Sequence, residues 1–87
     1  MLFARNRVFK RQFQKLESKL QTKIRERIDM LVIDEFNPVL NNHKLGPPYV
    51  SFRSINITGD YRLIYKRLTE GTYYLRAVGT HHQLYGT

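Results

Sequence analysis

The sequence lacks several features on which common protein functions depend. It contains no cysteine, which excludes disulfide bonds and cysteine-ligated zinc. No apolar run approaches the ~20 residues of a membrane-spanning helix, and the N-terminal segment is too short and too interrupted by charge for a secretory signal. Glycine-rich phosphate loops and the Gly-x-Ser-x-Gly pattern of a serine nucleophile are also missing. We therefore expect a cytoplasmic domain that neither spans a membrane nor hydrolyses nucleotides.

Acidic residues are scarce relative to basic ones. Seven Asp and Glu stand against fifteen Lys and Arg, which gives a net charge of +8. Nine of the fifteen basic residues fall within residues 1–27. Such a charge attracts polyanions, namely a nucleic acid, an anionic membrane surface or an acidic protein. The plainer interpretation is a solvated basic face that only aids solubility.

The N-terminal part of the chain has a helical pattern. Apolar residues recur at helical spacing from Phe9 onward. Ser18 and Gln21 form a possible capping box, which favours a break there and a helical hairpin. A single long helix is the alternative, because no Gly or Pro separates the two halves. The helical region ends before Asn37-Pro38, since a residue that precedes proline is disfavoured in helical conformation.

The rest of the chain has the pattern of a loop followed by three strands. The loop is expected over 37–48 and the strands over 49–57, 61–68 and 72–78, with a further short strand at 2–5. The order β-α-α-β-β-β fits one domain, residues 1–87. We predict an α+β fold in which an N-terminal helical hairpin packs on one face of a small, mostly antiparallel sheet.

Side-chain alternation assigns the two faces of that sheet. The face toward the helices is predicted to hold Tyr61, Leu63, Tyr65, Tyr73, Leu75 and Ala77. The opposite face is predicted to hold Arg62, Ile64, Lys66, Tyr74, Arg76 and Val78. One face is therefore core, and the other is a basic, aromatic surface open to a ligand.

The three histidines do not form a metal-binding pattern. His81 and His82 are adjacent, which on a strand sends them to opposite faces, and His43 lies far off in sequence. No His-x-x-x-His pair or carboxylate cluster completes a site. We expect neither a metal nor an organic cofactor.

A basic surface that also carries His, Tyr and Asp suits metal-free RNA cleavage. That reaction needs a base for the 2′-hydroxyl, cations for the charge on the phosphorane and an acid for the leaving 5′-oxygen. Histidine serves as acid or base near neutral pH, arginine binds phosphate through two donors, and tyrosine stacks on a base. The alternative is that Arg62 and His81 are only surface residues on an exposed sheet face.

Two segments carry a resemblance to a known family. Residues 59–65 read GDYRLIY, and residues 78–86 read VGTHHQLYG. In these motifs the sequence resembles the RelE/ParE toxin superfamily of toxin–antitoxin modules, and within it the YafQ-like branch of ribosome-dependent mRNA interferases. The resemblance extends over essentially the whole chain. The GTHxxLY ending is the more specific motif, because YRLIY also occurs in members that poison DNA gyrase.

The resemblance implies catalytic roles for five residues. His43 matches the loop histidine of the YafQ-like enzymes, and Asp60 matches their acidic residue before the middle strand. His81 matches the C-terminal histidine, the strongest candidate for general acid or base. Arg62 matches the arginine that binds the scissile phosphate, and Tyr85 a C-terminal aromatic residue.

One position departs from the YafQ-like pattern. Asn56 stands where those enzymes have a further catalytic histidine. Asparagine cannot shuttle a proton, so we expect either a slower enzyme or one that relies on Arg62 in the RelE manner.

The resemblance implies a toxin that cleaves mRNA in the ribosomal A site and is neutralised by a small cognate antitoxin. Ribosomal RNA and a largely acidic antitoxin would each be attracted by the basic surface. RNA binding is expected of Lys10, Arg11, Lys15, Lys19, Lys23, Lys44, Arg53, Asn56, Tyr61 and Arg76. Two alternatives stay open: a ParE-like protein that inhibits gyrase by binding alone, and an inactive homologue that keeps only antitoxin binding.

Overall fold

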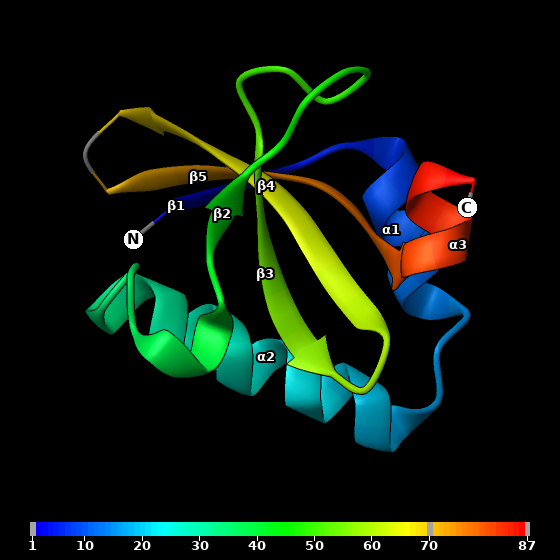
Figure 1. The fold of residues 1–87 in the computed structure, drawn as a ribbon. Coiled ribbons are helices and arrows are strands. Elements are labelled where there is room, and N and C mark those ends of the chain that lie inside the picture. The colour runs from blue at the N-terminus through cyan, green and yellow to red at the C-terminus, as the bar shows by residue number, and fades with distance from the viewer. Residues whose placement is uncertain (1, 70, 87) are drawn as a thin grey trace.

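The computed structural model describes residues 2–69 and 71–86. The N-terminal half contains β1 (Leu2–Arg5), α1 (Arg7–Gln14), α2 (Ser18–Ile33) and a 3₁₀ turn, η1 (Pro38–Leu40). The rest contains β2 (His43–Lys44), β3 (Arg53–Thr58), β4 (Tyr61–Thr69), β5 (Thr72–Thr80) and α3 (His81–Tyr85). The strands form one sheet in the order β1-β5-β4-β3-β2, in which β1 runs parallel to β5 and the other neighbours are antiparallel (Figure 1). Within these residues, no helix is long and apolar enough to cross a membrane.

The predicted α+β architecture is confirmed, with three short elements added. The sequence pattern did not indicate η1, β2 or α3. The strand predicted over 49–57 begins only at Arg53, because the preceding residues form a turn. In that turn Tyr49 N donates to Gly46 O at 2.9 Å, and Phe52 N donates to Tyr49 O at 3.0 Å.

The two N-terminal helices form the predicted hairpin, but not by the predicted cap. Ser18 is the first residue of α2 and Glu17 is its N-cap, without a side-chain hydrogen bond. The capping box is therefore wrong. Gln21 instead donates from Nε2 to the carbonyl of Phe13 at 2.8 Å, which satisfies a backbone acceptor at the end of α1 and ties the two helices together.

Apolar side chains form a core on each face of the sheet. The larger core lies between the sheet and α1 and α2, and consists of Phe9, Leu20, Ile24, Leu31, Leu40, Ile55, Ile57, Leu63, Tyr65, Tyr73, Leu75 and Val78. The smaller core lies on the opposite face and consists of Ile64, Ala77 and Leu84, with Leu45, Tyr49, Phe52 and Tyr85 packed against it. Burial of apolar surface, at about 25 cal/mol per Å², thereby holds α3 and the loop before β3 against the sheet.

A bulge in β5 corrects the predicted faces at the end of that strand. The partners of Ile64 and Tyr65 in β5 are two residues apart, so Arg76 is an extra residue. An extra residue reverses the alternation beyond it. Ala77 therefore belongs to the smaller core and Val78 to the larger one, the reverse of the prediction.

Candidate active site

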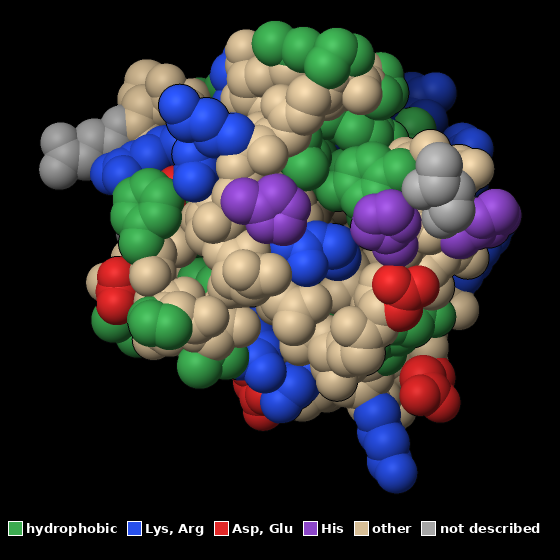
Figure 2. Space-filling view, in the orientation of Figure 1, with side chains coloured by type: hydrophobic (Ala, Val, Ile, Leu, Met, Phe, Trp, Pro, Cys, Tyr) green, Lys and Arg blue, Asp and Glu red, His purple; other side chains and the backbone are tan. Residues whose placement is uncertain are grey.

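A cleft of about 360 Å³ opens on the side of the sheet away from α1 and α2. Its lining comes from segments far apart in the sequence: His43, Leu45, Arg62, His81 and Tyr85. Figure 2 shows histidine side chains on either side of a Lys or Arg side chain on this face. The fold thus brings four of the five residues with implied catalytic roles into one cleft.

Arg62 occupies the middle of the cleft and is held by hydrogen bonds on three sides. Its Nε donates to Ser54 Oγ at 2.5 Å, its Nη1 to Asn56 Oδ1 at 3.3 Å and its Nη2 to the carbonyl of Asn41 at 3.2 Å. Partial burial lowers the pKa of Arg62, and the neighbouring Tyr85 hydroxyl opposes that shift. An arginine remains protonated in spite of such a shift, so the cleft carries a fixed positive charge.

His43 reaches Arg62 from the edge strand β2. Its Nδ1 lies 3.0 Å from the carbonyl of Asn41 and 3.4 Å from Arg62 Nη2. A carbonyl can only accept, so the shorter contact favours a proton on Nδ1. Nε2 then carries the lone pair of the neutral ring, which leaves it free to accept a proton from a substrate.

The short helix α3 places His81 and Tyr85 on the other side of the cleft. Thr80 and Gln83 form a capping box at its start: Gln83 N donates to Thr80 Oγ1 at 3.2 Å, and Thr80 N donates to Gln83 Oε1 at 2.9 Å. Gly79 makes room for this cap, since a Cβ there would lie 2.8 Å from Gln83 Oε1. The rings of His81 and Tyr85, one helical turn apart, lie 4.6 Å from each other.

The prediction that His81 and His82 point to opposite faces of a strand is wrong, because both residues lie in α3. His81 and His82 lie in the first turn of α3 rather than on a strand, so they are separated by about 100° around the helix axis. Both side chains are exposed, but His82 does not line the cleft.

The Tyr85 hydroxyl is buried beside the Arg62 guanidinium, and its interaction with Arg62 raises the pKa of that group against the effect of burial. Among the described residues it has no hydrogen bond of ideal geometry. Buried hydroxyls are normally hydrogen-bonded, and an oxygen of a ligand bound at Arg62 would offer this hydroxyl an acceptor.

Asp60 lies apart from the cleft. Its backbone carbonyl accepts a hydrogen bond from His81 N at 3.1 Å, which fixes the start of α3. The residue lines a separate cavity of about 460 Å³, whose lining also includes Lys15 and Glu17. The structure therefore connects Asp60 to the site through its backbone, and a catalytic role for its carboxylate stays a prediction.

Two of the residues expected to bind RNA lie on the helix side of the sheet. Tyr61 packs against the larger core, so its ring is not presented on the face that holds Arg62. Arg53 donates from Nε to Asn42 Oδ1 at 2.6 Å and lies over the Phe36 ring at 5.2 Å. Asn56, which alternates with the core residues Ile55 and Ile57 in β3, lies beside Arg62.

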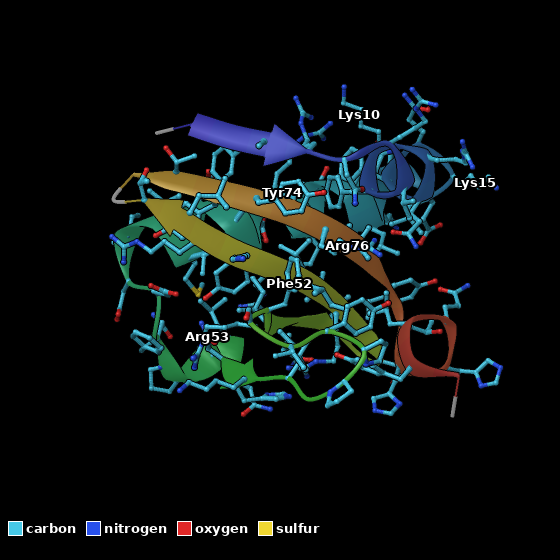
Figure 3. The ribbon with its side chains drawn as sticks, turned by 90° about the horizontal axis from the view of Figure 1, so that it is seen from above. Lys10, Lys15, Phe52, Arg53, Tyr74 and Arg76 are labelled. Atoms are coloured by element: carbon cyan, nitrogen blue, oxygen red, sulfur yellow. The ribbon has the colours of Figure 1, made fainter. Side chains whose placement is uncertain are left out.

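The basic residues of the first helices are displayed on the outside of the molecule. Lys10 and Lys15 project from α1 away from the sheet (Figure 3). The exposed side chains expected to bind RNA are Lys10, Arg11, Lys15, Lys19 and Lys44. Lys23 is less exposed and forms an ion pair with Glu26 at 3.6 Å.

Aromatic and basic side chains form a surface next to the cleft, and the sequence predicted only some of its residues. The Phe52 and Tyr74 rings lie 6.2 Å apart, and Lys66 Nζ is 5.7 Å from the Phe52 ring. Arg76, the bulge residue, lies over the Tyr49 ring at 5.7 Å. Figure 3 shows Phe52, Tyr74 and Arg76 over the strands. Strand alternation placed Tyr74 and Arg76 on this face, whereas the turn that brings Tyr49 and Phe52 had no clear sequence signal.

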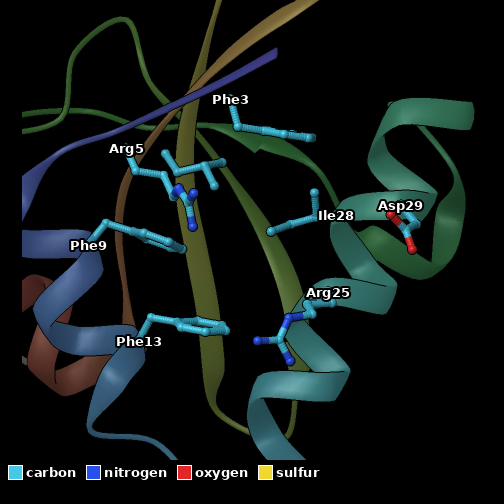
Figure 4. Close-up of a pocket in the computed structure, with 8 residues that line it drawn as sticks. Phe3, Arg5, Phe9, Phe13, Arg25, Ile28 and Asp29 are labelled. Atoms are coloured by element: carbon cyan, nitrogen blue, oxygen red, sulfur yellow. The ribbon is translucent and has the colours of Figure 1, made fainter. Parts of the chain in front are cut away.

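A further cavity, of about 340 Å³, lies on the helix side between β1, α1 and α2. The Phe9 and Phe13 rings from α1 face Ile28 and Arg25 from α2 across it (Figure 4). None of the residues with implied catalytic or RNA-binding roles lines it. Among the described residues, no three His, Asp or Glu side chains are grouped so as to hold a metal ion.

Comparison with solved structures shows that the fold is shared with YafQ and YoeB/ParE toxins, the fold that the sequence motifs predicted. YafQ from E. coli strain BL21(DE3) is similar with a TM-score of 0.81 and 20% identity over 97% of each chain. The YoeB/ParE toxin from Agrobacterium tumefaciens has a TM-score of 0.78 and 15% identity over 93% of this chain and 99% of its own. At these identities the likeness establishes the fold.

Some of the similar structures are complexes with a second protein. One is the E. coli DinJ-YafQ toxin-antitoxin complex. A chain of that complex is similar with a TM-score of 0.75 and 21% identity, over 97% of this chain and 96% of its own. No protein-family model matches the chain, and no curated protein sequence matches it either.

Proposed function

We propose that this chain, residues 1–87, is the toxin of a toxin–antitoxin pair and an endoribonuclease that cleaves mRNA in the ribosomal A site. The observation that carries the proposal is the convergence of His43, Arg62, His81 and Tyr85 on one cleft. These side chains supply the groups that metal-free RNA cleavage requires. The fold shared with YafQ and YoeB toxins supports the same conclusion.

The cleft provides opposed acid and base groups around a cation. Arg62 binds the scissile phosphate and stabilises the charge that develops on it. His43, with its Nε2 lone pair, and His81, across the cleft, are the residues able to exchange protons near neutral pH. In this mechanism one histidine takes the proton of the 2′-hydroxyl and the other protonates the leaving 5′-oxygen, while Tyr85 donates to a phosphate oxygen.

The partners proposed for the chain are both anionic. Ribosomal RNA would contact the exposed lysines of α1 and α2, where phosphates release counterions on binding. A cognate antitoxin, encoded beside the toxin and largely acidic, would be drawn by the same net charge of +8. Similar toxins in the DinJ-YafQ and YoeB-YefM structures are in complexes with antitoxins, which supports this partner. The setting of the reaction is the cytoplasm.

Induced expression with mapping of mRNA 5′ ends tests the proposal. We expect new 5′ ends inside reading frames, and cleavage of mRNA on programmed ribosomes but not of the same mRNA free in solution. Intact mRNA together with blocked DNA supercoiling would instead indicate the ParE-like gyrase inhibitor. Absence of both effects, with retained binding to the protein encoded next to it, would indicate an inactive homologue.

A further inference from the structure

The loop residue between Asn41 and His43 faces away from the cleft. In an extended segment consecutive side chains point to opposite faces, and here His43 contacts Arg62 while Asn42 points to the helix side of the sheet. The Asn42 amide donates from Nδ2 to Tyr65 Oη at 2.7 Å and to the carbonyl of Glu35 at 3.0 Å. This one side chain therefore joins the loop to both the turn that follows α2 and the middle of the sheet.

The partners of Asn42 are themselves fixed. Tyr65 is fully buried, and its hydroxyl donates to Glu35 Oε2 at 2.6 Å. Arg67 pairs with Glu35 Oε1 at 3.2 Å, and Arg53 donates from Nε to Asn42 Oδ1 at 2.6 Å. Every polar atom of the Asn42 side chain is thus engaged, by groups on β3, on β4 and in the turn that follows α2.

Besides Asn42, this part of the loop is held by the Asn41 backbone, whose carbonyl accepts from Arg62 Nη2 at 3.2 Å and whose N–H donates to Pro38 O at 3.2 Å. The strand β2 is only two residues long and lies at the edge of the sheet, so its pairing with β3 is short. Asn41, which precedes it, has a positive φ of 46° and is exposed. The position of the His43 ring relative to Arg62 therefore depends on the anchor one residue away.

We propose that Asn42 is a positioning residue for the reaction, which holds His43 in the cleft from the opposite side of the sheet. The inference rests on the proposed function, since it assigns the residue that orients a proposed base. Asn42 does not touch substrate in this mechanism; it acts through the backbone that it shares with His43. A displacement of about 1 Å at a reacting group costs up to about a hundredfold in rate.

A double-mutant cycle with His43 separates positioning from general stability. We expect Asn42→Ala to lower kcat on programmed ribosomes about tenfold to a hundredfold with little change in KM. In a His43→Ala background the same change should cost less than about threefold, because the residue that it positions is gone. A comparable loss of rate in both backgrounds would overturn the inference, as would an unchanged rate in His43→Ala alone.

Two further variants guard against loss of folding. Asn37→Ala is the matched control. It removes an Asn side chain from the same loop, one whose Oδ1 accepts from Val39 N at 3.0 Å within that loop, and it should leave kcat unchanged. Tyr65→Phe keeps the buried ring but removes the hydroxyl that Asn42 uses, and should reproduce part of the kcat loss. If Tyr65→Phe has wild-type kcat and Asn37→Ala loses as much as Asn42→Ala, the network has no positioning role.

A measurement on the free protein tests the inference independently of the proposed function. We expect backbone order parameters for residues 41–44 to fall in Asn42→Ala from about 0.85 toward about 0.6, with the rest of the chain unchanged. Unchanged order parameters would overturn the inference even if the wild type cleaves mRNA. A wild type that cleaves nothing would overturn the proposed function, and the anchor would still be decided by this measurement.

Discussion

Arg62 is the residue around which the cleft is built. Bonds to Ser54, Asn56 and the carbonyl of Asn41 use three N–H groups of its guanidinium. An arginine has five such donors in a fixed plane, so two remain for a phosphate while the side chain keeps its orientation. Ser54 is completely buried, so its hydroxyl supplies a fixed point for the guanidinium.

The first prediction concerns this geometry. Arg62→Lys should lower kcat/KM for ribosome-dependent cleavage about tenfold to a hundredfold, since an ammonium ion cannot keep the three protein hydrogen bonds and still present two parallel donors. That range corresponds to about 1.5–3 kcal/mol for a hydrogen bond to a charged group. Arg25→Lys, on the helix side, is the matched control. Full activity in Arg62→Lys would mean that charge alone is needed, or that Arg62 is outside the site.

The second prediction compares the adjacent histidines of α3. His81→Ala should lower the cleavage rate about 10²–10⁴-fold, the usual contribution of a general acid or base, with the thermal midpoint of unfolding little changed because the side chain is exposed. His82→Ala removes a ring that is also exposed but lies outside the cleft, and should keep wild-type toxicity. A folded His81→Ala protein with wild-type toxicity would remove this residue from the mechanism.

The third prediction tests the departure at Asn56. Its Oδ1 accepts one bond from Arg62, so Asn56→Ala should cost about the value of one hydrogen bond, roughly 0.5–1.5 kcal/mol or up to about tenfold in rate. Asn56→His should raise the rate or shift the pH profile toward a histidine pKa near about 6.5. A rate for Asn56→Ala as low as that of His81→Ala would show a catalytic role beyond orienting Arg62.

At the scale of elements, local signals predicted the helices and strands but not the connections that build the site. Helical spacing around Phe9, and the Asn37-Pro38 pair that follows α2, depend on neighbours in sequence, so the helical region and the three long strands were predictable. The break between α1 and α2 was predicted from a cap that does not form. The bulge at Arg76 is fixed by pairing with β4, and β2 exists only because His43 meets Ser54 across the sheet edge. Such long-range pairing leaves no periodic trace in the chain.

The candidate site shows the same division. Motifs indicated which residues matter, including Arg62 and His81, but they could not show that Asp60 lies outside the cleft. They also missed Asn42, because an Asn in a loop rich in Asn and Pro has the ordinary composition of a turn. Its role became visible only when Tyr65, far along the chain, was found as its partner.

The fourth prediction belongs to α1, whose exposed cations lie outside the cleft. Changing Lys10, Arg11 and Lys15 together to Gln should weaken ribosome association and reduce the slope of log affinity against log salt by up to about two to three, close to one for each phosphate that the variant no longer neutralises. The cleavage rate on ribosomes that are already bound should stay nearly unchanged, since the site residues are not altered. Unchanged affinity at several salt concentrations would mean that α1 only carries a solvated basic face.

At the scale of the whole molecule, the larger core and the candidate site lie on opposite faces of the sheet. The larger core on the helix side contains most of the buried apolar residues, whereas the smaller core on the other side leaves room for polar groups. The network of Glu35, Tyr65 and Asn42 is the polar part of the stabilising side, and it reaches the cleft only through the loop at the sheet edge. Buried polar networks of this kind contribute to stability only while every member is paired.

The fifth prediction follows from the titration of Tyr65 within that network. Burial, together with the hydrogen bond to Glu35, raises the pKa of Tyr65 well above its ordinary value of 10.0. The folded protein therefore holds the phenolic proton more tightly than the unfolded chain does, so the stabilisation is complete below about pH 10 and is lost as the pH rises above it. We expect the free energy of unfolding, measured by urea denaturation from pH 8 to pH 11, to fall more steeply above pH 10 in the wild type than in Tyr65→Phe. Tyr74→Phe, a partly exposed tyrosine on the opposite face, is the control and should follow the wild type. Parallel curves for wild type and Tyr65→Phe would show that the buried hydroxyl already titrates as it does in the unfolded chain, and that the network does not hold its proton.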